Sequence, residues 1–381
     1  MFSIKPLFAK AFTMVSTDVL FEPFRLKGIT LPNRIVMAPM TRSKSPGQIP
    51  GDDVAAYYRR RAVGGVGLIL TEGTSPEHRA ASNDANVPAF FGEVALAGWA
   101  KVLKEVKAAG GIIMPQLWHQ GIVRHAGTGP YPDAPSMSPS GLSRPGKKVA
   151  EPMTQRDIDE VIAGFARSAG YAKQLGFDGV EIHGAHGYII DQYFWEGTNA
   201  REDVYGGSLK QRTRFAGDII RAVRTTVGSD FPILLRFSQW KQQDFAAKLA
   251  AGPAELESFL KPLVDAGADC FHCSTRRFWE PEFPDTGSDL NLAGWTKKIS
   301  GKPTISVGSV GLNEDFIAAY RTKGAETAGI DRLLDMLGRG DFDLVAVGRA
   351  LIVNPDWPNK VRSGQFDQLK PYSPDALLSL D

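Results

Sequence analysis

The 381-residue chain contains only two cysteines, Cys270 and Cys273, which excludes a disulfide framework. They are three residues apart in "CFHC", inside an expected strand, and residues three apart in a strand point to opposite faces. We therefore expect neither a bridge nor a metal clip between them. So little cysteine favours a reducing compartment, and we predict a cytoplasmic protein, with a short targeting leader over residues 1–13 left open.

Membrane spans and nucleic-acid footprints are missing as well. No run of about 18 apolar residues occurs, so no segment is expected to cross a membrane. The 44 basic and 42 acidic residues nearly balance at a net charge of +2, and no basic run is long enough to bind nucleic acid. A hydrophobic content of 43% is ordinary for a globular protein with a large core.

Eight short apolar runs, rich in Ile, Val and Leu, are typical of buried parallel strands. They span 34–39, 66–72, 111–117, 178–183, 232–238, 268–274, 303–308 and 343–348. Between them, amphipathic stretches predict helices at 54–62, 97–109, 158–176, 208–227, 253–266, 313–337 and 355–363. Strands and helices in series predict an α/β fold, a (β/α)8 TIM barrel. A doubly wound sheet is the alternative, but no glycine-rich dinucleotide fingerprint follows the first strand.

We expect three parts along the chain. Residues 1–19 form an N-terminal extension that is predicted to be disordered, residues 20–365 form a single barrel, and residues 366–381 form a C-terminal tail. A hairpin within 18–31 is expected to cap the bottom of the barrel. The stretch 119–150, crowded with Pro, Gly and Ser, predicts a long loop after the third strand, and such loops are often functional.

In a TIM barrel the chemistry lies where strands end and the following loops begin. Polar, aromatic or glycine residues stand at these ends in seven of the eight strands. They are Thr41, Glu72, Gly73, Gln116, Trp118, His183, His186, Tyr188, Arg236, Gly308, Ser309, Gly348 and Arg349. Strand alternation places Glu181 and His183 on one face and directs Arg236 toward the barrel axis. A buried arginine needs an anion, so Arg236 pairs either with Glu181 or with a ligand.

His183 and His186 allow two interpretations. A catalytic zinc needs about three protein ligands, but neither H-x-H nor H-E-x-x-H appears, and a carboxylate or a loop histidine would have to complete the set. Alternatively, both imidazoles donate hydrogen bonds to one oxygen and stabilise charge that develops there. Tyr188, protonated at neutral pH, can then deliver a proton. No side chain supplies a hydride, so this second interpretation requires a cofactor.

Two glycine motifs, "VGSVG" at 307–311 and "VGRA" at 347–350, follow the seventh and eighth strands. Loops at these positions commonly bind phosphate in TIM barrels, and Arg349 provides a guanidinium that fits one. Tight turns with a surface arginine remain the alternative.

Five motifs together resemble the Old Yellow Enzyme family, whose members are FMN-dependent ene-reductases built on a (β/α)8 barrel. They are "NRIVMAPMTR" (33–42), "PQLWHQG" (115–121), "EIHGAHGY" (181–188), "NAREDVYGGSLKQR" (199–212) and "VGRALIVNPDW" (347–357). The resemblance covers residues 20 to 360 and keeps the order and spacing of the motifs.

The resemblance implies a role for each matching position. Pro39, Met40, Thr41, Gly73 and Gln116 would contact the flavin ring, Arg236 would lie at its N1 side, and Gly308, Ser309, Gly348 and Arg349 would bind the FMN phosphate. His183 and His186 would hold the substrate's carbonyl oxygen, Tyr188 would donate the proton, and Trp118 would line the substrate site.

The activity implied is ping-pong reduction of an α,β-unsaturated carbonyl or a similar activated alkene by NAD(P)H, in a monomer or homodimer. Two segments depart from the family pattern. Trp240 follows "FSQ", where many members have a proline after the serine, and the tail lacks a Tyr-Gly-Gly segment for which Tyr372 is a candidate substitute. Phe278 and Trp279 are candidate pocket walls. Another FMN barrel, a metal-dependent hydrolase barrel and a non-catalytic flavin protein are the rival hypotheses.

Overall fold

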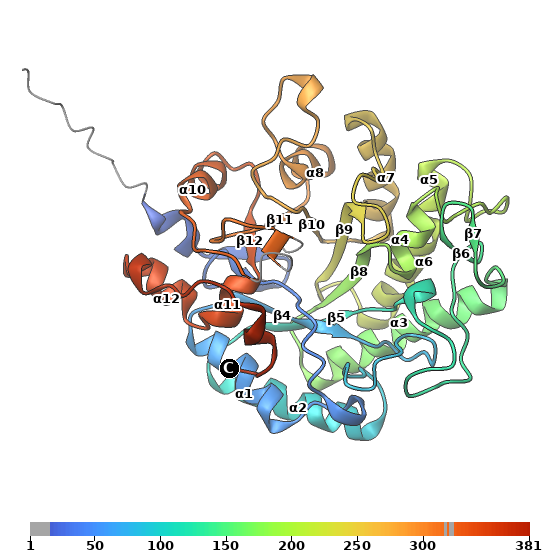
Figure 1. The fold of residues 1–381 in the computed structure, drawn as a ribbon, viewed down its shortest axis with the longest axis horizontal. Helices are drawn as coiled ribbons and strands as arrows, with labels where there is room; N and C mark the ends of the chain where they lie inside the picture. Colours follow the sequence, from blue (N-terminus) through green and yellow to red (C-terminus); the bar gives the residue numbers. More distant parts are fainter. Residues whose placement is uncertain (1–15, 316–317, 320–323) are drawn as a thin grey trace, which may run out of the picture.

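The computed structural model describes residues 16–315, 318–319 and 324–381. Eight parallel strands close into a barrel with the order β10-β11-β12-β3-β4-β5-β8-β9 (Figure 1). They are β3 (Ile35–Met37), β4 (Leu68–Thr74), β5 (Ile113–Leu117), β8 (Val180–His186), β9 (Ile233–Lys241), β10 (Cys270–Ser274), β11 (Thr304–Val307) and β12 (Leu344–Val347). Each falls on one of the eight predicted runs, so the predicted (β/α)8 barrel is confirmed.

Helices surround the barrel (Figure 1). They are α1 (Asp52–Val63), α2 (Glu93–Ala108), α3 (Gln155–Leu175), α4 (Ile189–Phe194), α5 (Leu209–Arg212), α6 (Arg214–Val227), α7 (Pro253–Ala266), α8 (Leu292–Ser300), α10 (Asp331–Gly338), α11 (Arg349–Val353) and α12 (Trp357–Arg362). The capping residues explain α3 well. Thr154 and Asp157 form a capping box at its start, and Gly176 ends it with a left-handed φ of 97°.

The helix predictions need correction. The short helices α4 and α11 and the nine-residue helix α8 were not predicted, although Asn291 caps α8 by accepting a hydrogen bond from the Gly294 N–H. The helix predicted over 313–337 is too long: residues 313–315 and 324–330 are not helical, α10 begins only at Asp331, and 316–317 and 320–323 lie outside the described residues.

A hairpin of β1 (Phe24–Leu26) and β2 (Ile29–Leu31) closes the bottom of the barrel, as predicted. Leu26 and Leu31 are fully buried in one apolar cluster with residues that fill the barrel interior, such as Leu68, Leu234 and Leu344. A second apolar cluster lies between the strands and the surrounding helices. Because the hairpin fills the bottom, a ligand can enter the barrel axis only from the opposite end, where the strands terminate.

The long loop after β5 carries a short 3-10 helix (Gly121–Val123) and a second hairpin, β6 (Leu142–Arg144) with β7 (Lys147–Lys148). In residues 16–315, 318–319 and 324–381 we find no helix long and apolar enough to cross a membrane. Residues 1–15 of the predicted N-terminal extension lie outside the described part of the chain.

Strand β8 contains the decisive irregularity. It runs to His186, three residues beyond the predicted end, and its pairing with β9 shifts register between Gly184 and His186. His186 has a φ of 65°, in the left-handed region that side chains other than glycine rarely adopt. In a regular strand His183 and His186 would point to opposite faces. The bulge turns His186 back, and both imidazoles line the same cavity.

Candidate active site

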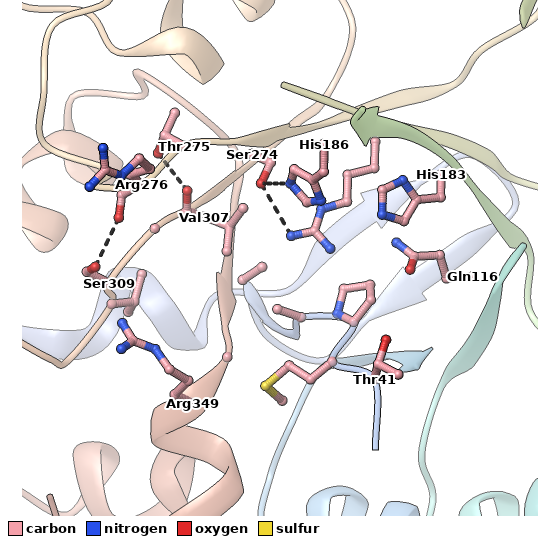
Figure 2. Close-up of a pocket in the computed structure, with 18 of the residues that line it drawn as sticks. Thr41, Gln116, His183, His186, Ser274, Thr275, Arg276, Val307, Ser309 and Arg349 are labelled. Carbon is pink, nitrogen blue, oxygen red and sulfur yellow. Dashed lines mark hydrogen bonds between the residues drawn. The ribbon is translucent and has the colours of Figure 1, made fainter. Parts of the chain in front are cut away.

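A cavity of about 430 Å³ opens where the barrel strands end. Its walls come from every barrel strand or the loop that follows it, except β4. The lining residues predicted from the sequence are Pro39, Met40, Thr41, Gln116, Trp118, His183, His186, Tyr188, Arg236, Gly308, Ser309, Gly348 and Arg349. Figure 2 shows His183, His186 and Gln116 on one side of this cavity, and Arg276, Ser309 and Arg349 on the other.

His183 is a neutral hydrogen-bond donor. Its Nδ1 atom accepts the backbone N–H of Ala185 at 3.2 Å, so its ring proton must lie on Nε2. Burial, followed by the nearby positive charge of Arg236, lowers the pKa of His183 well below its ordinary value. The ring therefore keeps one N–H and carries no charge at neutral pH.

His186 is held by two residues that the sequence did not single out for this purpose. Its Nε2 atom lies 2.8 Å from Oγ of Ser274, at the end of β10, and its ring stacks on Trp240 with centroids 4.5 Å apart. Arg236 donates to the same Ser274 hydroxyl at 3.4 Å, and we assign the hydroxyl's own O–H to the hydrogen bond with Nε2 of His186. The His186 proton then lies on Nδ1. Burial lowers the pKa of His186 well below its ordinary value, with Arg236 adding to the effect.

Tyr188 stays protonated. Burial raises its pKa above the ordinary value, while a hydrogen bond from Gln242 and the charge of Arg236 act in the opposite direction. Its ring meets those of Trp118 and His183 edge-on, at centroid distances of 5.0 and 5.1 Å. The phenol therefore lies beside the His183 ring with its hydroxyl at the cavity wall.

The sequence left two partners open for Arg236, either Glu181 or a ligand, and the contacts of Arg236 distinguish them. Among the described residues, Glu181 and Arg236 do not form an ion pair: the Glu181 carboxylate accepts a hydrogen bond from Gln116 Nε2 at 2.7 Å and pairs with His272 Nδ1 at 2.7 Å. Arg236 is 7% exposed, and within the described part of the chain its Nε atom has no hydrogen-bond partner. A buried guanidinium with an unused donor fits the ligand alternative better than a satisfied internal pair.

The far end of the cavity is built for an anion. Gly308 has a φ of 149°, and a Cβ there would lie 2.8 Å from the Thr275 carbonyl oxygen, so only glycine fits. Ser309 follows with a φ of 55°. The guanidinium of Arg349 donates to the carbonyl oxygens of Glu314 and Asp315 at 2.5 and 3.2 Å, which fixes its direction. Arg276, not predicted from the sequence, adds a second guanidinium, held by Asp315 at 2.8 Å.

The loop after β3 is fixed by a buried carboxylate. Glu72 on β4 accepts the backbone N–H groups of Arg42 at 2.9 Å and Ser43 at 3.1 Å, and these residues directly follow Thr41. Burial raises the pKa of Glu72 to about 7, although the two N–H donors oppose the shift. Glu72 therefore shapes the cavity wall formed by Pro39, Met40 and Thr41 without lining it.

Gly73 lies within β4 and is not among the lining residues. A Cβ there would lie 2.7 Å from the Trp118 ring, so glycine makes room for that indole. Trp118 in turn lines the cavity, and its Nε1 atom has no partner among the residues that the structure describes. The position of Gly73 thus affects the site through Trp118.

Of the two segments that depart from the family pattern, only the one with Trp240 lines the cavity. Trp240 lines the cavity and donates its indole N–H to the Ser274 carbonyl at 3.1 Å. Tyr372 is buried and lies under Arg349 at 5.5 Å, but it is not a lining residue. Phe278 and Trp279 pack edge-on against each other and do not line the cavity either.

The metal interpretation of the two histidines finds no ligand set. In the described ranges, no group of three His, Cys, Asp or Glu side chains is arranged to hold a metal ion. Cys270 and Cys273 are buried and unpaired with each other.

Comparisons with known proteins agree with this geometry. The model of the NADH:flavin oxidoreductase / NADH oxidase family matches residues 19–368. The chain belongs to this family. The predicted membership of the Old Yellow Enzyme family is thereby confirmed, and FMN with a nicotinamide hydride donor is its cofactor pair.

Individual relatives cover most of the chain. A 12-oxophytodienoate reductase 7 of Oryza sativa subsp. japonica is 39% identical, with 94% of this chain and 92% of the relative aligned. An NADH oxidase of Thermoanaerobacter brockii is 33% identical over 92% of this chain, which spans only 52% of that relative's length. A solved structure of morphinone reductase in complex with tetrahydroNAD superposes with a TM-score of 0.78 at 28% identity, covering 94% of this chain and 93% of the other.

The cavity fits FMN on grounds of its own. An isoalloxazine ring offers carbonyl and ring-nitrogen acceptors. Arg236 and Gln116 both line the cavity, and the Nε donor of Arg236 has no hydrogen-bond partner among the described residues. The ribityl phosphate needs cationic partners, and Arg276 and Arg349 supply them at the far end. The hydrogen-bond donors and guanidinium groups of this cavity therefore fit the FMN cofactor of the family.

Proposed function

We propose that the protein is an NAD(P)H-dependent ene-reductase that reduces the C=C bond of α,β-unsaturated carbonyls or similar activated alkenes. The observation that carries the proposal is one cavity wall that combines two neutral imidazole donors, His183 and His186, with a protonated phenol, Tyr188. The two imidazoles match a carbonyl oxygen of the substrate, and the phenol matches the alkene carbon that must receive a proton.

The imidazoles act on the carbonyl oxygen. Each ring has a single N–H, set by the bond from Ala185 to His183 and by the Ser274 hydroxyl next to His186. Two N–H donors on one oxygen stabilise the negative charge that builds there when a nucleophile adds to the β-carbon. Because both rings are neutral, they do not protonate the oxygen and the charge reaches the α-carbon.

When bound, FMN supplies the hydride, which it receives from NAD(P)H. Gln116 and Thr41 would hold the flavin ring, Ser309 and Arg349 would hold its phosphate, and Arg236 would stabilise negative charge on the ring through its buried guanidinium. NAD(P)H and the alkene would use the same wall of His183, His186 and Tyr188 in turn, which makes the kinetics ping-pong.

Tyr188 completes the reaction by giving its phenolic proton to the α-carbon. Its edge-on packing against His183 places the acid beside the oxygen clamp, so one substrate can hold its carbonyl oxygen at the imidazoles and its neighbouring α-carbon near the phenol. General acid catalysis of this kind contributes about 10²- to 10⁴-fold to the rate.

Purification tests the proposal. The protein is expected to be yellow, to release FMN on denaturation, and to oxidise NADPH in the presence of cyclohexenone with formation of cyclohexanone. A colourless protein that cannot be reconstituted with FMN contradicts the proposal, as does a flavoprotein that reduces none of a panel of enones, maleimides and nitroalkenes. Metal analysis of the same sample tests the hydrolase alternative.

A further inference from the structure

The turn that carries the clamp and the acid is strained. His186 and Gly187 both have positive φ angles, 65° and 80°, and Tyr188 directly afterwards is the N-cap of helix α4. A Cβ on Gly187 would meet only the end of the Gln243 side chain, so it is the positive φ rather than the lack of space that favours glycine there. A non-glycine residue in the left-handed region costs about 1 kcal/mol or more, and surrounding contacts must hold it in place.

Three consecutive residues at the end of β9 and just beyond it provide those contacts. The Gln242 backbone N–H donates to the His186 carbonyl at 3.3 Å, and Gln243 Nε2 donates to the Gly187 carbonyl at 3.2 Å. Lys241 forms a fully buried ion pair with Asp191 at 2.7 Å, and the other Asp191 oxygen accepts the Gly187 N–H at 2.7 Å. Segment 241–243 thus fixes the backbone of the turn from both sides.

This fixation brings one side chain to the acid. Gln242 lines the cavity at its rim, and its Nε2 atom donates to the Tyr188 hydroxyl oxygen at 2.9 Å. A phenol oxygen that accepts an amide N–H still has its own proton to give. When that proton leaves, the same amide donates to a phenolate, and a hydrogen bond to a charged acceptor is roughly twice as strong as a neutral one.

We propose that Gln242 is a positioning residue for proton delivery: its side-chain amide holds the Tyr188 hydroxyl so that the phenolic proton is directed into the cavity, and it stabilises the phenolate that remains. This role rests on the proposed ene-reductase function. It concerns the donation of a proton from Tyr188, a step that belongs to alkene reduction and not to reduction of the cofactor.

Two substitutions separate this role from packing. Glu has nearly the shape of Gln but replaces the N–H donor by a carboxylate, whereas Met keeps the length without either group. A packing role predicts that Gln242→Glu resembles wild type. A donor role predicts that Gln242→Met slows alkene reduction about tenfold or more, that Gln242→Glu slows it further, and that in both variants the NADPH half-reaction is slowed less than the alkene half-reaction. Gln368→Glu, an exposed glutamine on the distant 3-10 helix Phe366–Gln368, is the control for the added charge.

A readout independent of turnover is the titration of Tyr188. In protein carrying isotope-labelled tyrosine, the Tyr188 NMR signal is identified by its loss in Tyr188→Phe. In the part of the chain that the structure describes, one charged group faces it, Arg236 on β9, and one titratable ring packs against it, His183 on β8, which is neutral in the range where phenols titrate. We expect the Tyr188 pKa to rise in Gln242→Met and to rise more in Gln242→Glu, with no change in Gln368→Glu.

The outcomes are distinguishable. An unchanged Tyr188 titration in Gln242→Glu, or alkene reduction at the wild-type rate in that variant, overturns the role of Gln242. A wild-type flavoprotein that reduces no activated alkene overturns the proposed function instead, and the titration then still decides whether Gln242 holds the Tyr188 hydroxyl.

Discussion

The Nε2 atom of His186 lies 2.8 Å from the hydroxyl oxygen of Ser274. We assign the Ser274 hydroxyl as the donor in this pair: it accepts a hydrogen bond from Arg236 at 3.4 Å and donates its O–H to Nε2 of His186, which keeps the His186 N–H on Nδ1. Ser274, on β10, thereby selects the tautomer of His186, on β8, which is one of the two proposed clamp residues.

Removing this hydroxyl should weaken the oxygen clamp. In Ser274→Ala, His186 is free to carry its proton on either nitrogen, and we expect phenolic ligands to bind about tenfold more weakly, the value of one hydrogen bond. Titration of the long-wavelength charge-transfer band between a phenolate and FMN measures this affinity. Ser363→Ala, on the exposed surface after α12, is the control, and equal affinities in the two variants would contradict the tautomer assignment.

The clamp should be independent of pH across the range where exposed histidines titrate. Burial lowers the pKa of both His183 and His186 well below the ordinary value, so both rings stay neutral where exposed histidines titrate, at about pH 6.5. The dissociation constant of a ketone without ionisable groups, followed by its perturbation of the flavin spectrum, is expected to be flat over this range. Binding that weakens as the pH rises through about 6.5 would indicate imidazolium donors instead.

The barrel itself could be predicted from the sequence because its physical signal is strong. Eight apolar runs separated by amphipathic stretches leave few other folds, and all eight strands form. The helix α8 was missed because it follows a segment rich in Pro, Gly and charged residues, and because its nine residues are too few for a helical pattern of apolar positions to stand out.

The finer geometry of the site could not be predicted. Period-two alternation places His183 and His186 on opposite faces of a strand, and only the register shift at Gly184 unites them. The sequence also left Glu181 open as the partner of Arg236. Glu181 instead pairs with His272 and Gln116, and this pairing depends on how side chains from different strands meet inside the barrel. Ser274 carries no local signal at all, since a serine at a strand end is common.

The anion end of the cavity predicts a difference between FMN and riboflavin. In Arg349→Met we expect FMN to bind roughly ten- to a hundredfold more weakly, because a charge-assisted hydrogen bond to the phosphate is lost. Riboflavin, which lacks the phosphate, should bind equally to both proteins. Fluorescence quenching of each flavin by the apoprotein measures the two constants, with Arg221→Met on the outer surface of α6 as the control. Equal losses for both flavins would show that Arg349 supports the fold rather than the phosphate.

Glu72 predicts a stability change with pH. Its pKa is about 7 in the folded protein against 4.5 for the free side chain, so between these values the folded state holds a proton that the unfolded state has lost. The stabilisation from this proton is complete below about pH 4.5 and is lost as the pH rises through about 7. The free energy of unfolding of the wild type, relative to Glu72→Gln, is therefore expected to fall by about 3 kcal/mol over this window. Urea unfolding at several pH values measures it, with Glu257→Gln on the surface of α7 as control, and parallel curves for wild type and Glu72→Gln would contradict the assignment.

The most direct measurement of the central claim separates the two half-reactions of Tyr188→Phe by anaerobic stopped-flow spectroscopy. Only alkene reduction needs a proton from the enzyme, and Tyr188 is the protonated phenol beside the His183 and His186 clamp. We predict that reduction of the bound flavin by NADPH keeps its wild-type rate, while reoxidation by cyclohexenone slows by about 10²-fold or more. Equal rates of reoxidation in the two proteins, or an equal loss in both half-reactions, would contradict the assignment of Tyr188 as the acid.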